Sequence, residues 1–142
     1  MVFADVRGYT KLTEGLSPEQ VPGLMNRFYE TASQALLRHE SLLGQVEGDN
    51  VMALFVPGLA GKHYRTRAVE VARSLLQAVD WLDLGVGISR GEEFGNVGGG
   101  AREILVDAAT YETVADRCAT AERRRIELKG KGPVETFAIP LD

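Results

Sequence analysis

Two aspartates in apolar surroundings are the residues of this chain best suited to chemistry. Asp5 interrupts the apolar run at 2–6, and Asp49 lies in the turn at 48–50, just before the apolar run at 51–56. A carboxylate within a buried strand is costly unless it is paired or binds a cation. Taken alone, Asp49 is more typical of an ordinary turn residue than of a metal ligand. Two acids on two neighbouring strands, however, can meet around one or two hard metal ions. The pair therefore predicts a metal site with oxygen ligands.

Five stretches form a pattern that covers nearly the whole chain. They are FADVRGYT at 3–10, EGDNVMALF at 47–55, GVGISRGE at 85–92 with GNVG at 95–98, AREILV at 101–106 followed by Tyr111, and ELKGKGPVE at 127–135. Together, and in this order, they resemble the catalytic domain of class III nucleotidyl cyclases of the bacterial type. The resemblance implies an enzyme that converts ATP or GTP to the 3′,5′-cyclic nucleotide and pyrophosphate.

The order of the expected elements predicts an α+β fold. Strands are expected at 2–6, 42–46, 51–56, 84–89 and 94–97, and a closing hairpin at 124–128 and 134–139. Apolar residues at helical spacing predict helices from Ser17 to about His39 and from about Tyr64 to Val79, and Asp107 caps a shorter helix to about Arg117. The first six elements form a βαββαβ unit of the ferredoxin-like type. We expect an antiparallel sheet with the helices on one face.

The resemblance assigns roles to residues of the metal and triphosphate site. It implies that Asp5 and Asp49 are the catalytic carboxylates and bind two Mg²⁺ or Mn²⁺ ions with the carbonyl of Val6. The ions suit this reaction because they stabilise the charge that builds up on phosphate oxygens. The loop Arg7-Gly8-Tyr9-Thr10 is expected to present backbone N–H groups of Gly8, Tyr9 and Thr10 to the triphosphate. An ordinary strand-to-helix turn predicts the same glycine.

Further triphosphate contacts are expected from basic residues elsewhere in the pattern. Lys129 and Lys131 flank a glycine on the closing hairpin, where the family uses a lysine of the partner subunit, and Arg90 is a weaker candidate. As bare sequence, Lys-Gly-Lys is also typical of a solvated turn. The resemblance thus implies a homodimer with its sites across the subunit interface.

The purine-binding position differs from the adenylyl type. Gln45 stands where those enzymes have a lysine, and Glu47 lies close by. A carboxylate accepts hydrogen bonds from guanine N1–H and N2–H₂, whereas a lysine donates to adenine N1. Gln45 and Glu47 are therefore compatible with guanine as the bound base. Both residues are equally typical of polar side chains at a strand edge that bind no ligand.

Two segments of the family pattern are short or missing in the single domain at 1–142. The chain passes directly from Gly100 to Ala101 where the family has an acidic strand and a helix with an Asn and an Arg for the transition state, and the junction at 79–81 is short. Either the protein lacks these segments or this sequence omits them, and the three glycines at 98–100 favour omission. A true loss favours the alternative function, a degenerate cyclase-homology domain that binds nucleotide or a partner domain without turnover.

Composition narrows the remaining classes. The 142 residues carry a formal net charge of −4, which argues against a nucleic-acid partner and against a ferredoxin-like RNA-binding module. A diguanylate cyclase is disfavoured because Gly91-Glu92-Glu93-Phe94 lies on the wrong hairpin. The single cysteine, Cys118, fits a reducing compartment, so the domain is expected in the cytoplasm. The full-length protein is compatible with a regulatory or membrane domain outside this stretch.

Overall fold

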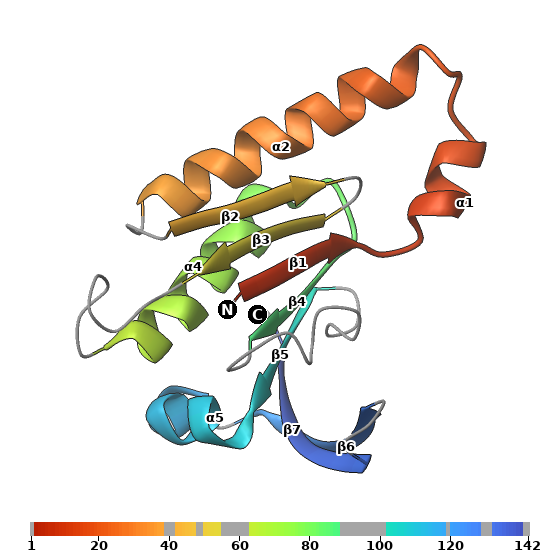
Figure 1. Cartoon of the computed structure of the whole chain (residues 1–142). Helices are drawn as coiled ribbons and strands as arrows, with labels where there is room; N and C mark the ends of the chain where they lie inside the picture. Colours follow the sequence, from red (N-terminus) through yellow and green to blue (C-terminus); the bar gives the residue numbers. More distant parts are fainter. Residues whose placement is uncertain are drawn as a thin grey trace.

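The computed structural model describes residues 2–38, 42–47, 50–54, 63–88, 102–118, 120–128 and 132–140, with the backbone alone for residues 42–47, 50–54 and 128. Figure 1 shows the elements in chain order. They are β1 (Val2–Val6), α1 (Tyr9–Glu14), α2 (Gln20–Arg38), β2 (Leu42–Glu47), β3 (Asn50–Leu54), α4 (Tyr64–Ala78), β4 (Leu84–Ile88), β5 (Glu103–Asp107), α5 (Ala108–Val114), a 3-10 turn (Ala115–Arg117), β6 (Glu122–Leu128) and β7 (Gly132–Pro140).

The described strands form one sheet in the order β2-β3-β1-β4-β5-β7-β6. The first four strands of this order pair antiparallel, and they alternate with α2 and α4 along the chain as the predicted βαββαβ unit. The hairpin of β6 and β7 closes the far edge, also as predicted. The ferredoxin-like α+β fold is therefore confirmed.

One pair of strands departs from the antiparallel arrangement. β5 pairs with β4 in parallel, with Val86 opposite Ile104 and Ile88 opposite Val106. No strand was predicted at 101–106. The residues Ile104, Leu105 and Val106 are at most 2% exposed, and burial on both faces is typical of a parallel strand. The apolar residues 104–106 thus belong to an interior strand of the sheet.

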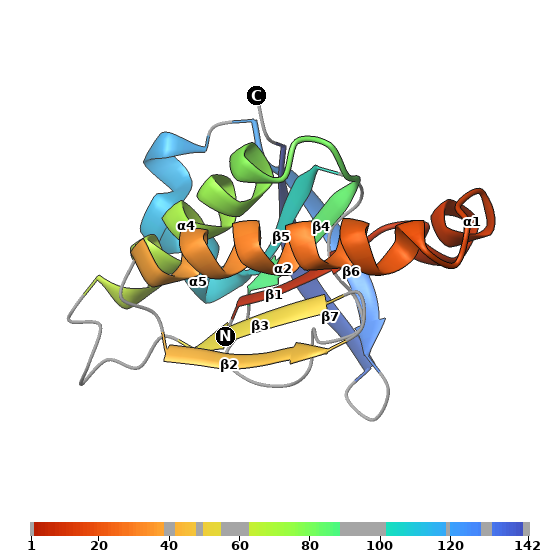
Figure 2. The ribbon, with the colours of Figure 1, turned by 90° about the horizontal axis from the view of Figure 1, so that it is seen from above.

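The helices cover one face of the sheet. Figure 2 shows α2, α4 and α5 on the same side, with α2 and α4 packed against each other. The predicted apolar faces are buried: α2 contributes Met25, Phe28, Ala32, Ala35 and Leu36, and α4 contributes Ala68, Val71, Ala72, Leu75 and Leu76. Side chains from β1, β4, β5 and β7 complete the core beneath them. Helical periodicity in the sequence therefore located the core correctly.

Local capping signals are also seen in the structure. The backbone N–H of Ser17 donates to Oε1 of Gln20 at 2.9 Å, which is the return half of a capping box. The regular helix begins at Gln20, two residues later than Pro18 suggested. The Asp107 side chain accepts from the N–H of Thr110 at 2.8 Å and caps α5 as predicted.

A short helix occupies part of the expected loop. α1 begins at Tyr9, so the loop predicted at 7–10 is reduced to the turn at Arg7 and Gly8. Tyr9 and Leu12 are spaced by three residues and pack against the core, which favours a helical turn over an open loop. The strand predicted at 94–97 lies outside the described residues. Of the helices in the described part, none has the length and apolarity needed to cross a bilayer.

Candidate functional site

Strand β1 places two charged side chains on the open face of the sheet. Val2, Ala4 and Val6 are buried against the helices, so the alternation of a strand directs Asp5 and Arg7 to the opposite face. Arg7 Nε lies 3.6 Å from Asp5 Oδ1, and the two side chains are 31% and 24% exposed. The aspartate singled out in the sequence is thus held at the end of β1 beside an arginine.

The strand register places Asp5 opposite the residue that follows the second predicted aspartate in the sequence. Asp5 pairs with Asn50 on β3, which is the residue that follows Asp49. On its other side Asp5 pairs with Gly85 of β4, which has no side chain to occupy the open face. Asp49 itself lies outside the described residues. The neighbouring strands that the metal-site prediction requires are therefore present at this position.

The chain leaves β1 through a turn at Arg7 and Gly8. Gly8 adopts the left-handed conformation, with φ 67° and ψ 29°, and its carbonyl accepts from the N–H of Leu12 at 2.9 Å. The N–H groups of Tyr9, Thr10 and Lys11 precede that first helical hydrogen bond, so they have no acceptor within the helix. No side chain caps this end. The role of Gly8, Tyr9 and Thr10 in binding phosphate stays a prediction.

A second turn packs beside this loop. The N–H of Arg7 donates to the carbonyl of Asp83 at 2.6 Å, which extends the pairing of β1 with β4 by one step. Trp81 packs against the core, and the guanidinium carbon of Arg27 on α2 lies 4.2 Å from its ring centroid. The turn at residues 79–83 therefore connects α2 to the loop that follows Asp5.

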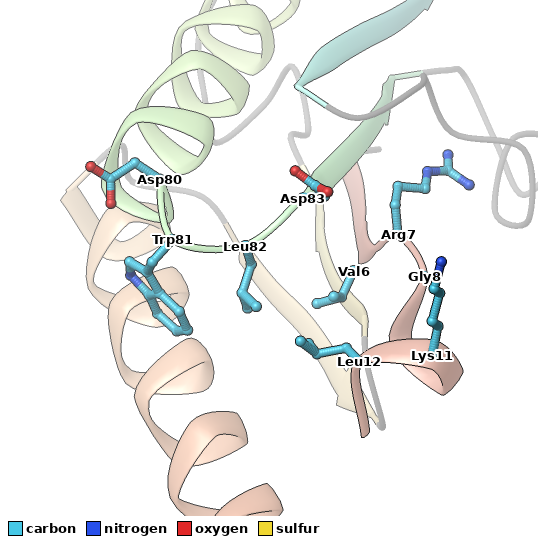
Figure 3. Close-up of a pocket in the computed structure, with 9 residues that line it drawn as sticks. All are labelled: Val6, Arg7, Gly8, Lys11, Leu12, Asp80, Trp81, Leu82 and Asp83. Atoms are coloured by element: carbon cyan, nitrogen blue, oxygen red, sulfur yellow. The ribbon is translucent and has the colours of Figure 1, made fainter. Parts of the chain in front are cut away.

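An open cavity of about 410 Å³ separates this turn from α1. Figure 3 shows Val6, Leu12 and Leu82 around its centre, with Trp81 and Asp80 on one side and Arg7 and Lys11 on the other. Gly8 and Asp83 complete the lining. α1 has no fully buried residue, but its Tyr9 and Leu12 pack against the core.

Several predicted site residues lie beyond what the structure describes. Arg90, Lys129 and Lys131 fall outside the described residues, as does Asp49. The backbone of Gln45 and Glu47 lies on β2, with Glu47 paired to Asn50, and the positions of their side chains are outside the description. The register of β6 and β7 does reach Leu128 and Gly132, which bracket the Lys-Gly-Lys stretch.

The oxygen donors that are described suit a hard divalent cation. Asp5 offers a carboxylate whose Oδ1 is buried. The pairing of β1 with β3 ends at Asp5, and the next residue is Val6, whose backbone carbonyl is the other predicted oxygen ligand. Carboxylate and carbonyl oxygens are the ligands that Mg²⁺ prefers. Within the described part of the chain, no three His, Cys, Asp or Glu side chains gather into a metal-binding group. A site here therefore needs a further ligand such as Asp49.

Three features of the site were not predicted from the sequence. The side chain of Arg7 was considered only as part of a loop, although the spacing Asp5–Arg7 places both groups on one face of a strand. The contact of Trp81 with Arg27 and the bond between Arg7 and Asp83 had no sequence signal, because they join segments far apart in the chain.

Solved structures of nucleotidyl cyclases share this fold over nearly the whole chain. The guanylyl cyclase Cya2 has a TM-score of 0.83 at 19% identity, over 99% of this chain and 91% of that one. The adenylyl cyclase CyaB from P. aeruginosa has a TM-score of 0.76 at 21% identity, over 97% and 91%. The guanylate cyclase domain of RhGC from Catenaria anguillulae, solved in complex with GTP, has a TM-score of 0.80 at 14% identity, over 99% and 94%.

Curated relatives match at similar identity. Adenylate cyclase 1 of Rhizobium meliloti (strain 1021) is 24% identical over 79 residues, which is 56% of this chain and 12% of that protein. The uncharacterized protein Rv1318c of Mycobacterium tuberculosis is 28% identical over 130 residues, which is 87% of this chain and 24% of that protein. The chain thus spans a quarter or less of the length of these relatives. No family model matches it.

The fold defines the class of this domain. The chain has the fold of class III nucleotidyl cyclase catalytic domains, and one curated relative is named an adenylate cyclase. The resemblance drawn from the sequence motifs is therefore confirmed.

Proposed function

We propose that this domain is a nucleotidyl cyclase that converts ATP or GTP to the 3′,5′-cyclic nucleotide. The observation that carries the proposal is the position of Asp5. It lies near the end of β1 on the face of a cyclase-type sheet opposite the helices, it pairs with the residue that follows Asp49, and the turn at Arg7 and Gly8 begins two residues after it.

The chain's own groups have distinct tasks in this reaction. Asp5, Asp49 and the carbonyl of Val6 would hold two Mg²⁺ or Mn²⁺ ions, which would lower the pKa of the 3′-hydroxyl and neutralise phosphate charge. The amides of Gly8, Tyr9 and Thr10 fix the β- and γ-phosphates, with Lys129, Lys131 and Arg90 as further contacts. The 3′-oxygen then bonds to the α-phosphorus, its proton passes to solvent, and the bond to the departing pyrophosphate breaks. Catalysis is mostly positioning.

The base remains open between adenine and guanine. Glu47 and Gln45 lie on β2, next to the strand that begins at Asn50. Carboxylate and amide oxygens suit the donor groups of guanine. The solved structures with the same fold include both adenylyl and guanylyl cyclases. The activity assay therefore uses both ATP and GTP.

The active form is a homodimer in the cytoplasm, where nucleoside triphosphates are available. A dimer is expected because the metal carboxylates and the lysine of the closing hairpin would come from opposite subunits. The longer relatives leave room for a regulatory or membrane-attached part outside this domain.

A second candidate function is binding without turnover. It is favoured by one feature of the sequence: after Gly100 no asparagine precedes an arginine by four residues, so the transition-state pair of the family has no match. A degenerate domain of this kind keeps metal and nucleotide binding through Asp5 and Asp49 but forms no cyclic product.

The test is a Mn²⁺-supported assay with ATP and GTP side by side. We expect cyclic product from one or both, and no product from Asp5→Ala. Asp116→Ala is the matched control, since Asp116 is exposed on the 3-10 turn after α5. Activity that survives in Asp5→Ala contradicts the cyclase assignment. Metal-dependent nucleotide binding without any product selects the degenerate domain.

A further inference from the structure

Arg7 has a pair of buried donors that lack acceptors. Its Nε and Nη2 atoms are inaccessible to solvent and form no hydrogen bond to the described part of the chain. Asp5 Oδ1 lies 3.6 Å from Nε, which is beyond hydrogen-bonding distance. Asp5 therefore balances the charge of Arg7 without satisfying its N–H groups.

The identity of the two atoms indicates the missing acceptor. Nε–H and Nη2–H lie on the same edge of the guanidinium and point in the same direction, so they bind two oxygens of one phosphate or carboxylate at once. Buried donors without acceptors are rare in folded proteins and ask for an explanation. An oxyanion on this edge of Arg7 is such an explanation.

The surroundings of Arg7 favour a polyphosphate as that oxyanion. The residue immediately precedes the left-handed Gly8, and its own N–H donates to the carbonyl of Asp83. Figure 3 shows the side chain of Lys11 on the same side of the cavity as Arg7, with Asp80 on the other side. Two cationic side chains thus line the same side of the cavity at the end of β1.

We propose that Arg7 is a bidentate polyphosphate-binding residue that Asp5 holds in place until the ligand arrives. The inference rests on the proposed function, since it concerns the same site. In the complex with a metal–polyphosphate, Asp5 would bind the metal, and the guanidinium of Arg7 would leave its buried position beside Asp5 and bind phosphate oxygens through its Nε–Nη2 edge. The spacing Asp5–Arg7 on one strand thereby couples metal binding to phosphate binding.

This arrangement predicts opposite effects of Arg7 on two ligands. Without a polyphosphate, the Arg7 cation competes with a metal ion for Asp5, so Arg7→Ala should bind Mn²⁺ alone about two- to five-fold more tightly. With a polyphosphate, the loss of two charge-assisted hydrogen bonds should weaken binding of Mn²⁺–tripolyphosphate about ten- to hundred-fold. Arg7→Lys keeps the charge but not the planar edge, so it should resemble the native chain with Mn²⁺ alone and bind tripolyphosphate more weakly.

The experiment is calorimetric titration of the native chain, Arg7→Ala and Arg7→Lys with Mn²⁺ and then with Mn²⁺–tripolyphosphate. Arg125→Ala is the matched control, because Arg125 is exposed on β6 and its removal changes the net charge equally. Circular dichroism checks that each variant is folded. If Arg7→Ala does not fold, Arg7→Lys decides, since tripolyphosphate affinity equal to that of the native chain then overturns the bidentate contact.

Two further outcomes separate this proposal from the proposed function. Unchanged tripolyphosphate affinity in Arg7→Ala, or an equal loss of affinity for Mn²⁺ and tripolyphosphate, overturns the role of Arg7 even if cyclic nucleotide is formed. Opposite shifts for the two ligands support that role even if ATP and GTP yield no product, in which case the cyclase proposal alone falls.

Discussion

Single residues determine how the loop after β1 meets its ligand. Gly8 is the clearest case, because its φ of 67° lies in the left-handed region, which is unfavourable for residues with a Cβ atom. A Cβ added at Gly8 would have no heavy atom within 4 Å. Backbone conformation, and not space, therefore explains the glycine at this position.

Gly8→Ala should lower the free energy of unfolding by about 1 kcal/mol. It should also weaken tripolyphosphate binding, since the amides of α1 would be held less firmly. Urea denaturation and calorimetry measure the two effects. Gly23→Ala on α2 is a useful comparison, because a Cβ there also meets open space but replaces a helical glycine without positive φ. Equal stability of Gly8→Ala and the native chain would contradict the strain argument.

A second residue-scale effect concerns the far edge of the sheet. Arg124 on β6 donates to both carboxylate oxygens of Glu103, at 2.9 and 3.1 Å, and to Glu122 at 2.9 Å. The hydrogen bond and the charge of Arg124 hold the pKa of Glu122 below its ordinary value of 4.5, and the same contacts raise the pKa of Arg124. The ionised form of Glu122 is thus favoured in the folded chain.

The sign of the resulting pH dependence follows. A carboxylate whose pKa is lowered by folding stabilises the fold above its unfolded pKa, and this contribution is lost as the pH falls through the folded pKa. We expect Glu122→Gln to be less stable than the native chain at pH 7, and the difference to shrink below pH about 4. Thermal unfolding between pH 3 and 7 measures this, with Glu127→Gln on the same strand as control. A difference that grows on acidification would contradict the pairing.

At the scale of elements, the turn at residues 79–83 links the long helix α2 to the loop after β1. Arg27 lies over Trp81, and the carbonyl of Asp83 accepts from Arg7. A cation over an indole at an exposed position contributes about 0.5–1 kcal/mol. The contact is weak by itself, but it fixes the segment that borders the cavity next to α1.

The coupling between Arg27 and Trp81 can be measured directly. Arg27→Ala should lower stability by about 0.5 kcal/mol in the native chain and have little effect when Trp81 is already leucine. Urea denaturation of the two single variants and the double variant gives the interaction energy. Additive effects of the two substitutions would show that the ring contact contributes nothing.

At the scale of the whole molecule, the proposed reaction depends on a second copy of the chain. Asp5 lies on β1 in the interior of the sheet, whereas the Lys-Gly-Lys stretch stands in the sequence between β6 and β7, and β4 and β5 lie between β1 and the nearer of these two strands. That separation agrees with a site completed by the lysine of a partner subunit.

Complementation between inactive variants tests this arrangement. Asp5→Ala and a variant with Lys129→Ala and Lys131→Ala should each be inactive. Mixing them in equal amounts should restore about a quarter of the native activity, because half of the dimers are mixed and each has one intact site. No recovery, with dimers confirmed by light scattering, would show that both groups act within one chain.

The sequence by itself determined the features that depend on local pattern. The apolar spacing of α2 and α4, the cap at Asp107, the order of the core strands and the position of Asp5 in an apolar strand were all readable, because periodicity and capping need only neighbours in the chain. The motif order also indicated the cyclase fold. The roles of Asp49, Arg90, Lys129 and Lys131 stay predictions.

Only the tertiary structure decided the features that join distant segments. The parallel pairing of β5 with β4 depends on burial from both sides, which an isolated apolar run at 103–107 does not reveal. The helix that begins at Tyr9 depends on the packing of Tyr9 and Leu12 against the core. The unsatisfied edge of Arg7 emerges only once the residue is bonded to Asp83 and placed beside Asp5. Each of these depends on the desolvation of groups by partners far away in sequence, and local propensity carries no record of those partners.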